Sequence, residues 1–276
     1  MSLSQKTRNL FNGITKSNEG FEKLLNLRGA DVNAVNESGN SLLYVAAEKG
    51  LVDKINILLS KGANINIKNE RGITPLNVVC DRKALGIVQL LIDNGADINT
   101  MTNRGNTPLT CMASGKGCSN MKAFAFNSVY DFTEVAELLL DNGADVNLNS
   151  PLLIAARVGN LNMVQLLMTR GANINATTPT GETALDIAQS HGHTEIVTFL
   201  KEFQTLSTIH VFKNMPMVYG NTGIDTYKDL QEYIAEGKNT KKTKKHRRGK
   251  KISKNGKNGK NGKKTINKRK NSRKRV

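Results

Sequence analysis

The sequence has no tryptophan, no long apolar run, and only three cysteines among its 276 residues. No window approaches the roughly 18 apolar residues that a membrane span needs, and the N-terminal stretch MSLSQKTRNLFNG lacks the apolar core of a secretion signal. Cys80, Cys111 and Cys118 form an odd set without C-x-x-C spacing, which argues against a disulfide framework and against a zinc site. These absences predict an intracellular protein in a reducing compartment, without membrane contact.

Acidic residues are absent from residues 238–276, whereas 20 of the 40 Lys and Arg residues lie there. Residues 1–237 therefore hold 20 basic and 23 acidic groups, a net charge of −3. The cationic tail has too few apolar side chains to fold, so we expect it to be disordered. Its two densest clusters resemble nuclear-localisation signals and would also bind phosphate backbones without sequence preference. The clusters lie at 241–251 and 263–276, and the predicted contacts within them are Lys241, Lys242, Lys244, Lys245, Arg247, Arg248, Lys250, Lys251, Lys268, Arg269, Lys270, Arg273, Lys274 and Arg275.

One phrase recurs through residues 29–203, and it is built around a Gly-Ala pair. The glycines of these pairs are Gly29, Gly62, Gly95, Gly143 and Gly171, so the steps are 33, 33, 48 and 28 residues. Each pair follows an apolar segment with helical spacing, and a Ser or Thr then opens another short apolar helix. These starting residues are Ser41, Thr74, Thr107, Ser150 and Thr183. A single helix pair cannot bury its apolar stripe, so we expect the units to stack.

The 33-residue period and the phrases RGITPLNVVC and RGNTPLTCMA resemble the ankyrin repeat. The resemblance implies an all-α ankyrin-repeat solenoid of stacked helix pairs with short turn fingers. It also implies a protein partner that binds along the concave face. The richness in Asn, Lys and Ile is similar to that of ankyrin proteins from giant DNA viruses or intracellular bacteria.

We expect four parts along the chain. Residues 1–33 form N-terminal capping helices and the first turn, with Phe21, Leu24, Leu25 and Leu27 available to pack inward. Residues 34–203 form the repeat array, 204–237 an appended segment, and 238–276 the tail. The unequal steps predict an insertion near 114–130 and a deleted turn near 148–149.

The histidine of the family phrase T-P-L-H is missing from all five units. Its position is occupied by Tyr44, Asn77, Thr110, Leu153 and Asp186. In the family this histidine links neighbouring repeats by hydrogen bonds. We therefore expect part of that polar network to be missing and the array to be looser than a regular one.

No catalytic, cofactor or metal constellation is recognisable, so we expect no enzyme. His191 and His193 in SHGHTEIV fit the ordinary link between two helices better than a metal site, since no further ligand lies nearby in sequence. Cys80 and Cys111 lie in first helices, and Cys80 occupies a slot that Ala47 fills elsewhere, so a small buried thiol is expected. Cys118 lies in the insertion, where exposure would make it oxidisable.

Candidate partner contacts lie at the turn tips and in the insertion. They are Asn36, Glu37, Asn69, Glu70, Arg71, Asn103, Arg104, Phe124, Phe126 and Tyr130. Solvated turns explain the first seven equally well, and the aromatic residues are expected to pack onto the third unit rather than to form a contact patch.

The sequence thus predicts a monomeric, non-enzymatic scaffold for protein–protein interaction. Its tail would contact an import receptor or nucleic acid and so provide nuclear targeting or nonspecific tethering. The alternative is a cytosolic, host-directed adaptor, located in the cytoplasm, in which the tail is only a solubilising extension.

Overall fold

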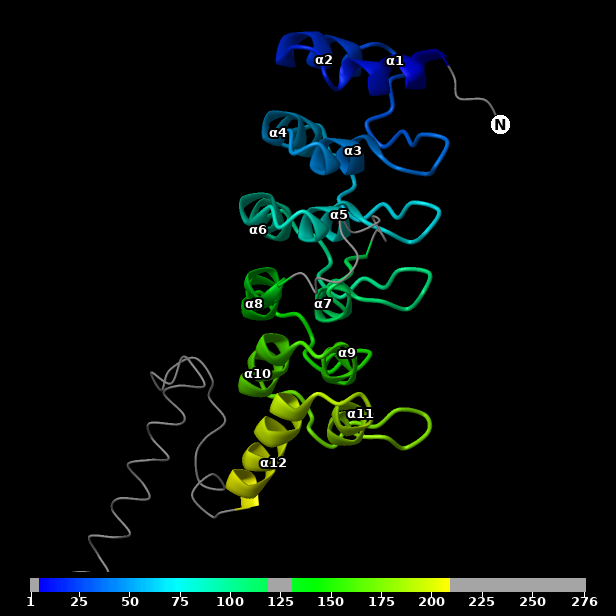
Figure 1. Cartoon of the computed structure of the whole chain (residues 1–276). Helices are drawn as coiled ribbons and strands as arrows, with labels where there is room; N and C mark the ends of the chain where they lie inside the picture. Colours follow the sequence, from blue (N-terminus) through cyan, green and yellow to red (C-terminus); the bar gives the residue numbers. More distant parts are fainter. Residues whose placement is uncertain (1–4, 119–130, 209–276) are drawn as a thin grey trace, which may run out of the picture. The chain divides into compact units, whose positions relative to one another are not determined.

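The computed structural model describes residues 5–118 and 131–208, which form twelve α-helices and, besides them, only two isolated β-bridges (Figure 1). The helices are α1 Gln5–Gly13, α2 Asn18–Leu25, α3 Leu42–Glu48, α4 Val52–Ser60, α5 Pro75–Asp81, α6 Leu85–Asp93, α7 Pro108–Ala113, α8 Thr133–Asp141, α9 Pro151–Val158, α10 Leu161–Thr169, α11 Ala184–Ser190 and α12 Thr194–Thr208. The appended segment beyond residue 208 and the tail lie outside the described residues.

The helices lie in pairs, and each pair packs against the next (Figure 1). The inner row consists of α3, α5, α7, α9 and α11, in which each helix contacts its successor. The outer row consists of α4, α6, α8, α10 and α12, and each outer helix packs on its inner partner. The predicted all-α solenoid of stacked helix pairs is confirmed for the described residues.

A leucine four residues before the Gly-Ala pair anchors each of the outer helices α4, α6, α8 and α10. Leu58, Leu91, Leu139 and Leu167 occupy this slot, and all four are 0% exposed. Full burial of one such side chain is worth about 1.5–3 kcal/mol. The glycine that follows adopts the left-handed conformation and ends the helix, as Gly62 does with φ +80°. The same core slot is therefore filled in regular and irregular repeats alike.

Residues in the former histidine position help to cap the N-termini of three inner helices, α5, α7 and α11. The Asn77 side-chain carbonyl accepts the Thr74 backbone N–H at 2.9 Å, and the Thr74 hydroxyl oxygen accepts the Asn77 N–H. Thr107 with Thr110 and Thr183 with Asp186 form the same reciprocal capping box. Loss of the histidine has therefore left these helix caps intact.

An asparagine ladder joins neighbouring repeats. It consists of the asparagines of the Gly-Ala-x-x-Asn phrases, Asn33, Asn66, Asn99 and Asn147. Each side-chain carbonyl accepts a backbone N–H of the next repeat at 2.7–2.9 Å; the donors are Asn64, Asp97, Asp145 and Asn173. This ladder uses residues other than those at the former histidine position, so it joins the repeats at four junctions without replacing the histidine's bonds. The stability of the array remains a prediction.

A buried lysine attaches the N-terminal helix pair to α4. Lys54 is 4% exposed, its ammonium donates to Asn18 Oδ1 at 2.8 Å, and it lies 5.2 Å from the centre of the Phe21 ring. Phe21 is fully buried, as expected. The expectation that Leu27 packs inward is wrong, because it follows the end of α2 and is 57% exposed.

Four turns project from the same side of the stack, beside α3, α5, α7 and α11 (Figure 1). We call them the first, second, third and fifth fingers, at residues 34–41, 67–74, 100–107 and 176–183. No fourth finger precedes α9, because Asn149 and Ser150 both adopt left-handed conformations, with φ +57° and +52°, and turn the chain directly into the helix. Ser150 marks the predicted helix start but does not cap it, unlike Ser41.

Candidate functional site

The turns of the fingers are held by side chains that sequence analysis had assigned to partner binding. Asn69 is 9% exposed, and its side-chain carbonyl accepts the N–H groups of Arg71 and Ile73 at 3.0 Å. Its amide group donates to Asn40 of the first finger at 2.8 Å. Asn36 accepts two backbone N–H groups of its own finger in the same way. Both asparagines therefore shape their turns. Asn69 is buried while it does so, and partner contact through Asn36 remains a prediction.

Hydrogen bonds fix the first three fingers in register. The Glu70 N–H donates to the Ser38 carbonyl at 3.4 Å, and the Asn103 N–H donates to the Arg71 carbonyl at 3.1 Å. The Asn103 side-chain amide adds a bond to the Glu70 carbonyl at 2.7 Å. Asn103, another predicted contact, thus joins two fingers. The fingers form one row whose backbone groups are paired across it.

Close approach between these fingers depends on glycine. A side chain at Gly72 would meet the Asn103 backbone nitrogen at 2.5 Å, and one at Gly39 would meet the Glu70 nitrogen at 2.9 Å. Gly105 of the third finger has the same left-handed backbone but open space around it. The finger row therefore ends at the third finger.

On either side of the missing fourth finger, the third and fifth fingers differ from the paired fingers in their hydrogen bonds. The Asn149 side-chain amide donates to the Gly105 carbonyl and closes part of the third finger's free side. In the fifth finger, Pro179 takes the position from which Glu70 and Asn103 donate to the preceding finger. Proline has no N–H, so the fifth finger has no bond to offer there.

Charged and amide side chains remain exposed along the tips. Glu37, Glu70, Arg71, Asn103 and Arg104 are all exposed. Asn36 is only half-buried but is used within its turn, as described above. Along the row, one tip position holds Glu37, Glu70 and Asn103, and the next position holds Arg71 and Arg104 in the second and third fingers. The tips thus present an acidic and a basic file side by side, a pattern suited to recognition of a polar protein surface.

Arg71 also faces the inner row. It hydrogen-bonds the side chain of Tyr44 in α3, which occupies a former histidine position. Burial raises the pKa of Tyr44, and the nearby Glu48 raises it further, while Arg71 opposes both. Tyr44 therefore stays protonated at neutral pH and links a finger residue to the helix core.

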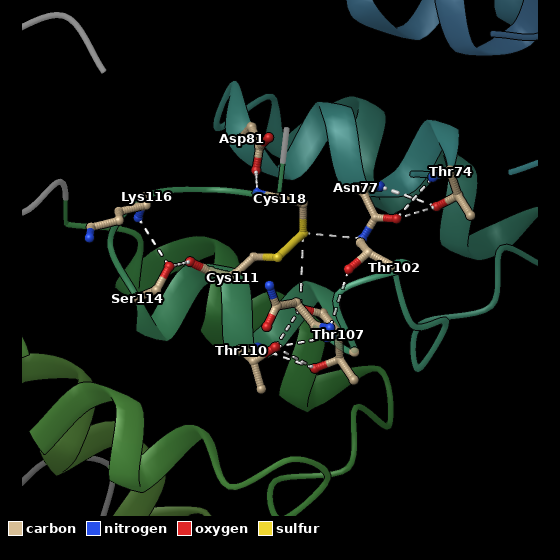
Figure 2. The surroundings of a disulfide bond; sticks show 12 residues. Thr74, Asn77, Asp81, Thr102, Thr107, Thr110, Cys111, Ser114, Lys116 and Cys118 are labelled. Carbon is tan, nitrogen blue, oxygen red and sulfur yellow. Dashed lines mark hydrogen bonds between the residues drawn. A yellow bond between two sulfur atoms is a disulfide. The ribbon is translucent and has the colours of Figure 1, made fainter. Parts of the chain in front are cut away.

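The insertion begins with a disulfide, which corrects the expectation of unlinked cysteines. Figure 2 shows Cys111, in α7, bonded to Cys118, seven residues later, with a Cα–Cα distance of 5.0 Å. The Cys118 N–H donates to the Asp81 carboxylate of α5 at 2.7 Å, and Asn77 Nδ2 lies 3.3 Å from its sulfur. The predicted buried thiol at Cys80 is confirmed, and burial raises its pKa above the ordinary value.

Both ends of the insertion contact the same turn of the second repeat. One end reaches Asp81 through Cys118, and the other places the Phe132 ring 5.1 Å from the Lys83 ammonium. Lys83 adopts a left-handed conformation where Gly50 stands in the first repeat. The predicted contacts Phe124, Phe126 and Tyr130 lie outside the described residues.

The two histidines of SHGHTEIV have structural roles. His191 Nδ1 lies 2.9 Å from the Ile187 carbonyl of its own helix, and His193 Nε2 lies 3.1 Å from the Arg157 carbonyl. The His193 ring also occupies the space beside Gly159. Within residues 5–118 and 131–208, no three His, Cys, Asp or Glu side chains are grouped as metal ligands.

Comparison with protein families agrees with this geometry. The model described as "Ankyrin repeats (3 copies)" matches residues 13–102, 43–149 and 121–208. The chain belongs to the ankyrin repeat family. The ankyrin array is accordingly a protein–protein interaction scaffold, and its partners are proteins.

One curated relative of the ankyrin array is "Probable E3 ubiquitin-protein ligase XBOS33" from Oryza sativa subsp. japonica. It is 47% identical over 57 residues, which cover 21% of this chain and 11% of that protein. The chain therefore matches only a small part of this relative. None of the helices described here has the length and apolar character that crossing a bilayer requires.

Proposed function

We propose that this chain is a non-enzymatic, monomeric scaffold that binds its protein partner through the tips of the first three fingers and the adjoining inner row. The observation that carries this proposal is the register of the finger row. The bonds from Glu70 and Asn103 to the preceding fingers leave side chains, rather than backbone, facing outward. Rigid turns that present exposed polar side chains bind with little loss of conformational entropy.

The chain's reactive side chains support the non-enzymatic part of the proposal. The Cys80 thiol is fully buried. His191 contacts the Ile187 carbonyl and the Ser190 hydroxyl, and His193 contacts the Arg157 carbonyl. The ligase relative shares only the 57-residue match, so ubiquitin ligation is not proposed for this chain.

A tip variant tests the surface. Glu70→Ala with Arg104→Ala in the full chain removes two exposed side chains but retains the backbone bonds of the fingers. Glu195→Ala with Lys201→Ala on α12 is a matched control, since both residues are exposed and lie away from the fingers. Proteins captured by the wild type and the control should be lost from the tip variant. Equal capture by all three proteins would contradict the proposed surface.

We also propose that the basic tail, residues 238–276, directs the protein to the nucleus or tethers it to nucleic acid. Its 20 positive charges and absence of acidic residues support this role. Duplex affinity should fall linearly with the logarithm of salt concentration, with a slope of about −0.9 per phosphate neutralised. Deletion of the tail should abolish both duplex binding and nuclear accumulation. A truncated chain that keeps both properties would favour the cytosolic adaptor with a solubilising tail.

A further inference from the structure

We infer that Cys111 and Cys118 form a redox site, which exchanges with low-molecular-weight thiols or a dithiol protein and controls how the start of the insertion is attached to α5. The inference rests on the placement of the two cysteines and on the partners that each one has. It does not require that the proposed binding surface be correct, since the site is defined by its own chemistry.

The disulfide holds residues 114–118 across two inner helices. Cys111 lies in α7, while Cys118 contacts Asp81 and Asn77 in α5 (Figure 2). Gly117 is so close to α5 that an added side chain would meet the Asp81 carboxylate at 2.5 Å. The oxidised pair therefore covers part of the inner face with the chain's own backbone.

Both sulfurs also have suitable surroundings in the reduced state. Cys111 is 2% exposed and occupies the slot that Val45 and Val78 fill in the first two repeats, so a thiol packs there as a small apolar group. A Cys118 thiol could accept from Asn77 Nδ2 at 3.3 Å and donate to the Thr107 carbonyl at 3.9 Å. Neither thiol would therefore be buried without a suitable partner after reduction, and the repeat can remain folded in both states.

The exchange begins at the more accessible sulfur. Cys118 is half-buried whereas Cys111 is buried, so an external thiolate attacks Cys118 Sγ. The bond between the cysteines breaks, and the electron pair leaves on Cys111 Sγ, which takes a proton from water. A second external thiolate then attacks the external sulfur of the mixed disulfide and releases the Cys118 thiolate, which is protonated. Two external thiols become one disulfide, and the protein disulfide becomes two thiols.

Cys80 provides an internal reference for this chemistry. It is a free cysteine that is fully buried, and burial raises its thiol pKa. A thiol that stays protonated and inaccessible does not exchange. The redox response should therefore involve only the pair in the third repeat.

The test uses the full chain in mixtures of reduced and oxidised glutathione. After denaturation, alkylation should count one free thiol in the oxidised protein and three in the reduced protein. The far-UV circular dichroism should be the same in both states. Hydrogen exchange of the Cys118 amide, which is bonded to Asp81, should become about tenfold faster or more on reduction, since the short covalent loop no longer holds it.

Four variants make this result specific. Cys118→Ser should show fast amide exchange at residue 118 in both buffers, and Cys80→Ala should respond like the wild type. Asp81→Ala removes the acceptor that holds Cys118 beside α5, so the ratio of oxidised to reduced protein should fall about tenfold at fixed glutathione, the equivalent of one hydrogen bond to a charged group. Asp81→Asn keeps an acceptor oxygen, so it should restore most of the wild-type ratio of oxidised to reduced protein.

Three results would overturn the inference. The first is three free thiols after equilibration with oxidised glutathione, which would mean that the pair does not close. The second is reduction only when the array unfolds, which would mean that the pair is no exchange site in the folded protein. The third is an unchanged Cys118 amide after reduction, which would mean that the pair does not control the attachment to α5.

Discussion

At the junction between the second and third repeats, Asn103 donates to the Arg71 carbonyl and the two fingers touch. At the junction between the third and fourth repeats no finger follows, and a side chain added at Gly105 would meet no atom within 4 Å. Both junctions nevertheless have a buried leucine in α6 or α8 and a ladder bond, from Asp97 to Asn66 or from Asp145 to Asn99. The helices and the ladder therefore hold the array together, and the fingers are free to vary for recognition.

The largest expected effect tests whether the irregular junction is as well packed as the regular one. Leu58→Ala, Leu91→Ala and Leu139→Ala each remove a fully buried side chain from the same slot, so each should cost about 2–5 kcal/mol. Equilibrium unfolding in urea measures these losses. A loss at Leu139 below about 0.5 kcal/mol, beside large losses at the other two, would show that the insertion loosens the third repeat.

The second prediction separates finger contact from backbone strain. Gly72→Ala and Gly105→Ala both place an alanine in the left-handed region, which costs about 1 kcal/mol. Gly72→Ala also forces the second finger away from the Asn103 nitrogen, so it should cost about 2 kcal/mol in total. Thermal unfolding of the two variants gives the difference. Equal losses would mean that the second and third fingers do not pack tightly in solution.

The third prediction concerns the ladder. Asn66→Ala and Asn99→Ala each remove the acceptor of one backbone N–H from the next repeat, at a cost of about 1 kcal/mol each. The two ladder bonds have the same length, 2.9 Å, and Asn66 adds only a longer bond to the Gly95 carbonyl, at 3.4 Å. The costs at the regular and irregular junctions should therefore agree to within about 0.5 kcal/mol. A clearly smaller loss at Asn99 would show that the ladder weakens where the finger is missing.

The smallest effect is a pH dependence at the last inner helix. Hydrogen bonds from Thr183 lower the pKa of Asp186, so the folded state gains stability above the carboxyl's unfolded pKa of about 4. This gain is lost as pH falls through the lower folded value. The Tm difference between wild type and Asp186→Ala should therefore shrink below pH of about 4. Asn77→Ala, which removes an uncharged residue from the same position, should show a difference that changes little over this range.

Much of the repeat architecture could be predicted from sequence because it depends on local signals. The 33-residue period, the Ser and Thr helix starts, and Gly62 beyond the end of α4 all act within a few residues. The positions of the exposed tips Glu37, Glu70 and Arg104 follow from the same period. The deleted turn before Ser150 was visible as a short step, although its left-handed conformation was not.

Features that depend on contacts between repeats were missed. The role of Asn69 within its turn and the bond from Asn103 to Glu70 need the spacing of two fingers, which composition does not reveal. The disulfide was missed because Cys118 reaches Cys111 only after the chain turns back across α5. Two cysteines seven residues apart, one in a helix and one in an irregular loop, are the signal that could have suggested it.

Pro179 limits what would follow if the missing fourth finger were restored. Suppose that a mutation restored the missing turn between Asn147 and Ser150. By the pattern of the first three fingers, the new turn could donate an N–H to the third finger. The fifth finger could not donate to the new turn in the same way, because Pro179 has no N–H. A restored turn would therefore keep a carbonyl without the inter-finger bond that joins the first three fingers, unless Pro179 were replaced as well.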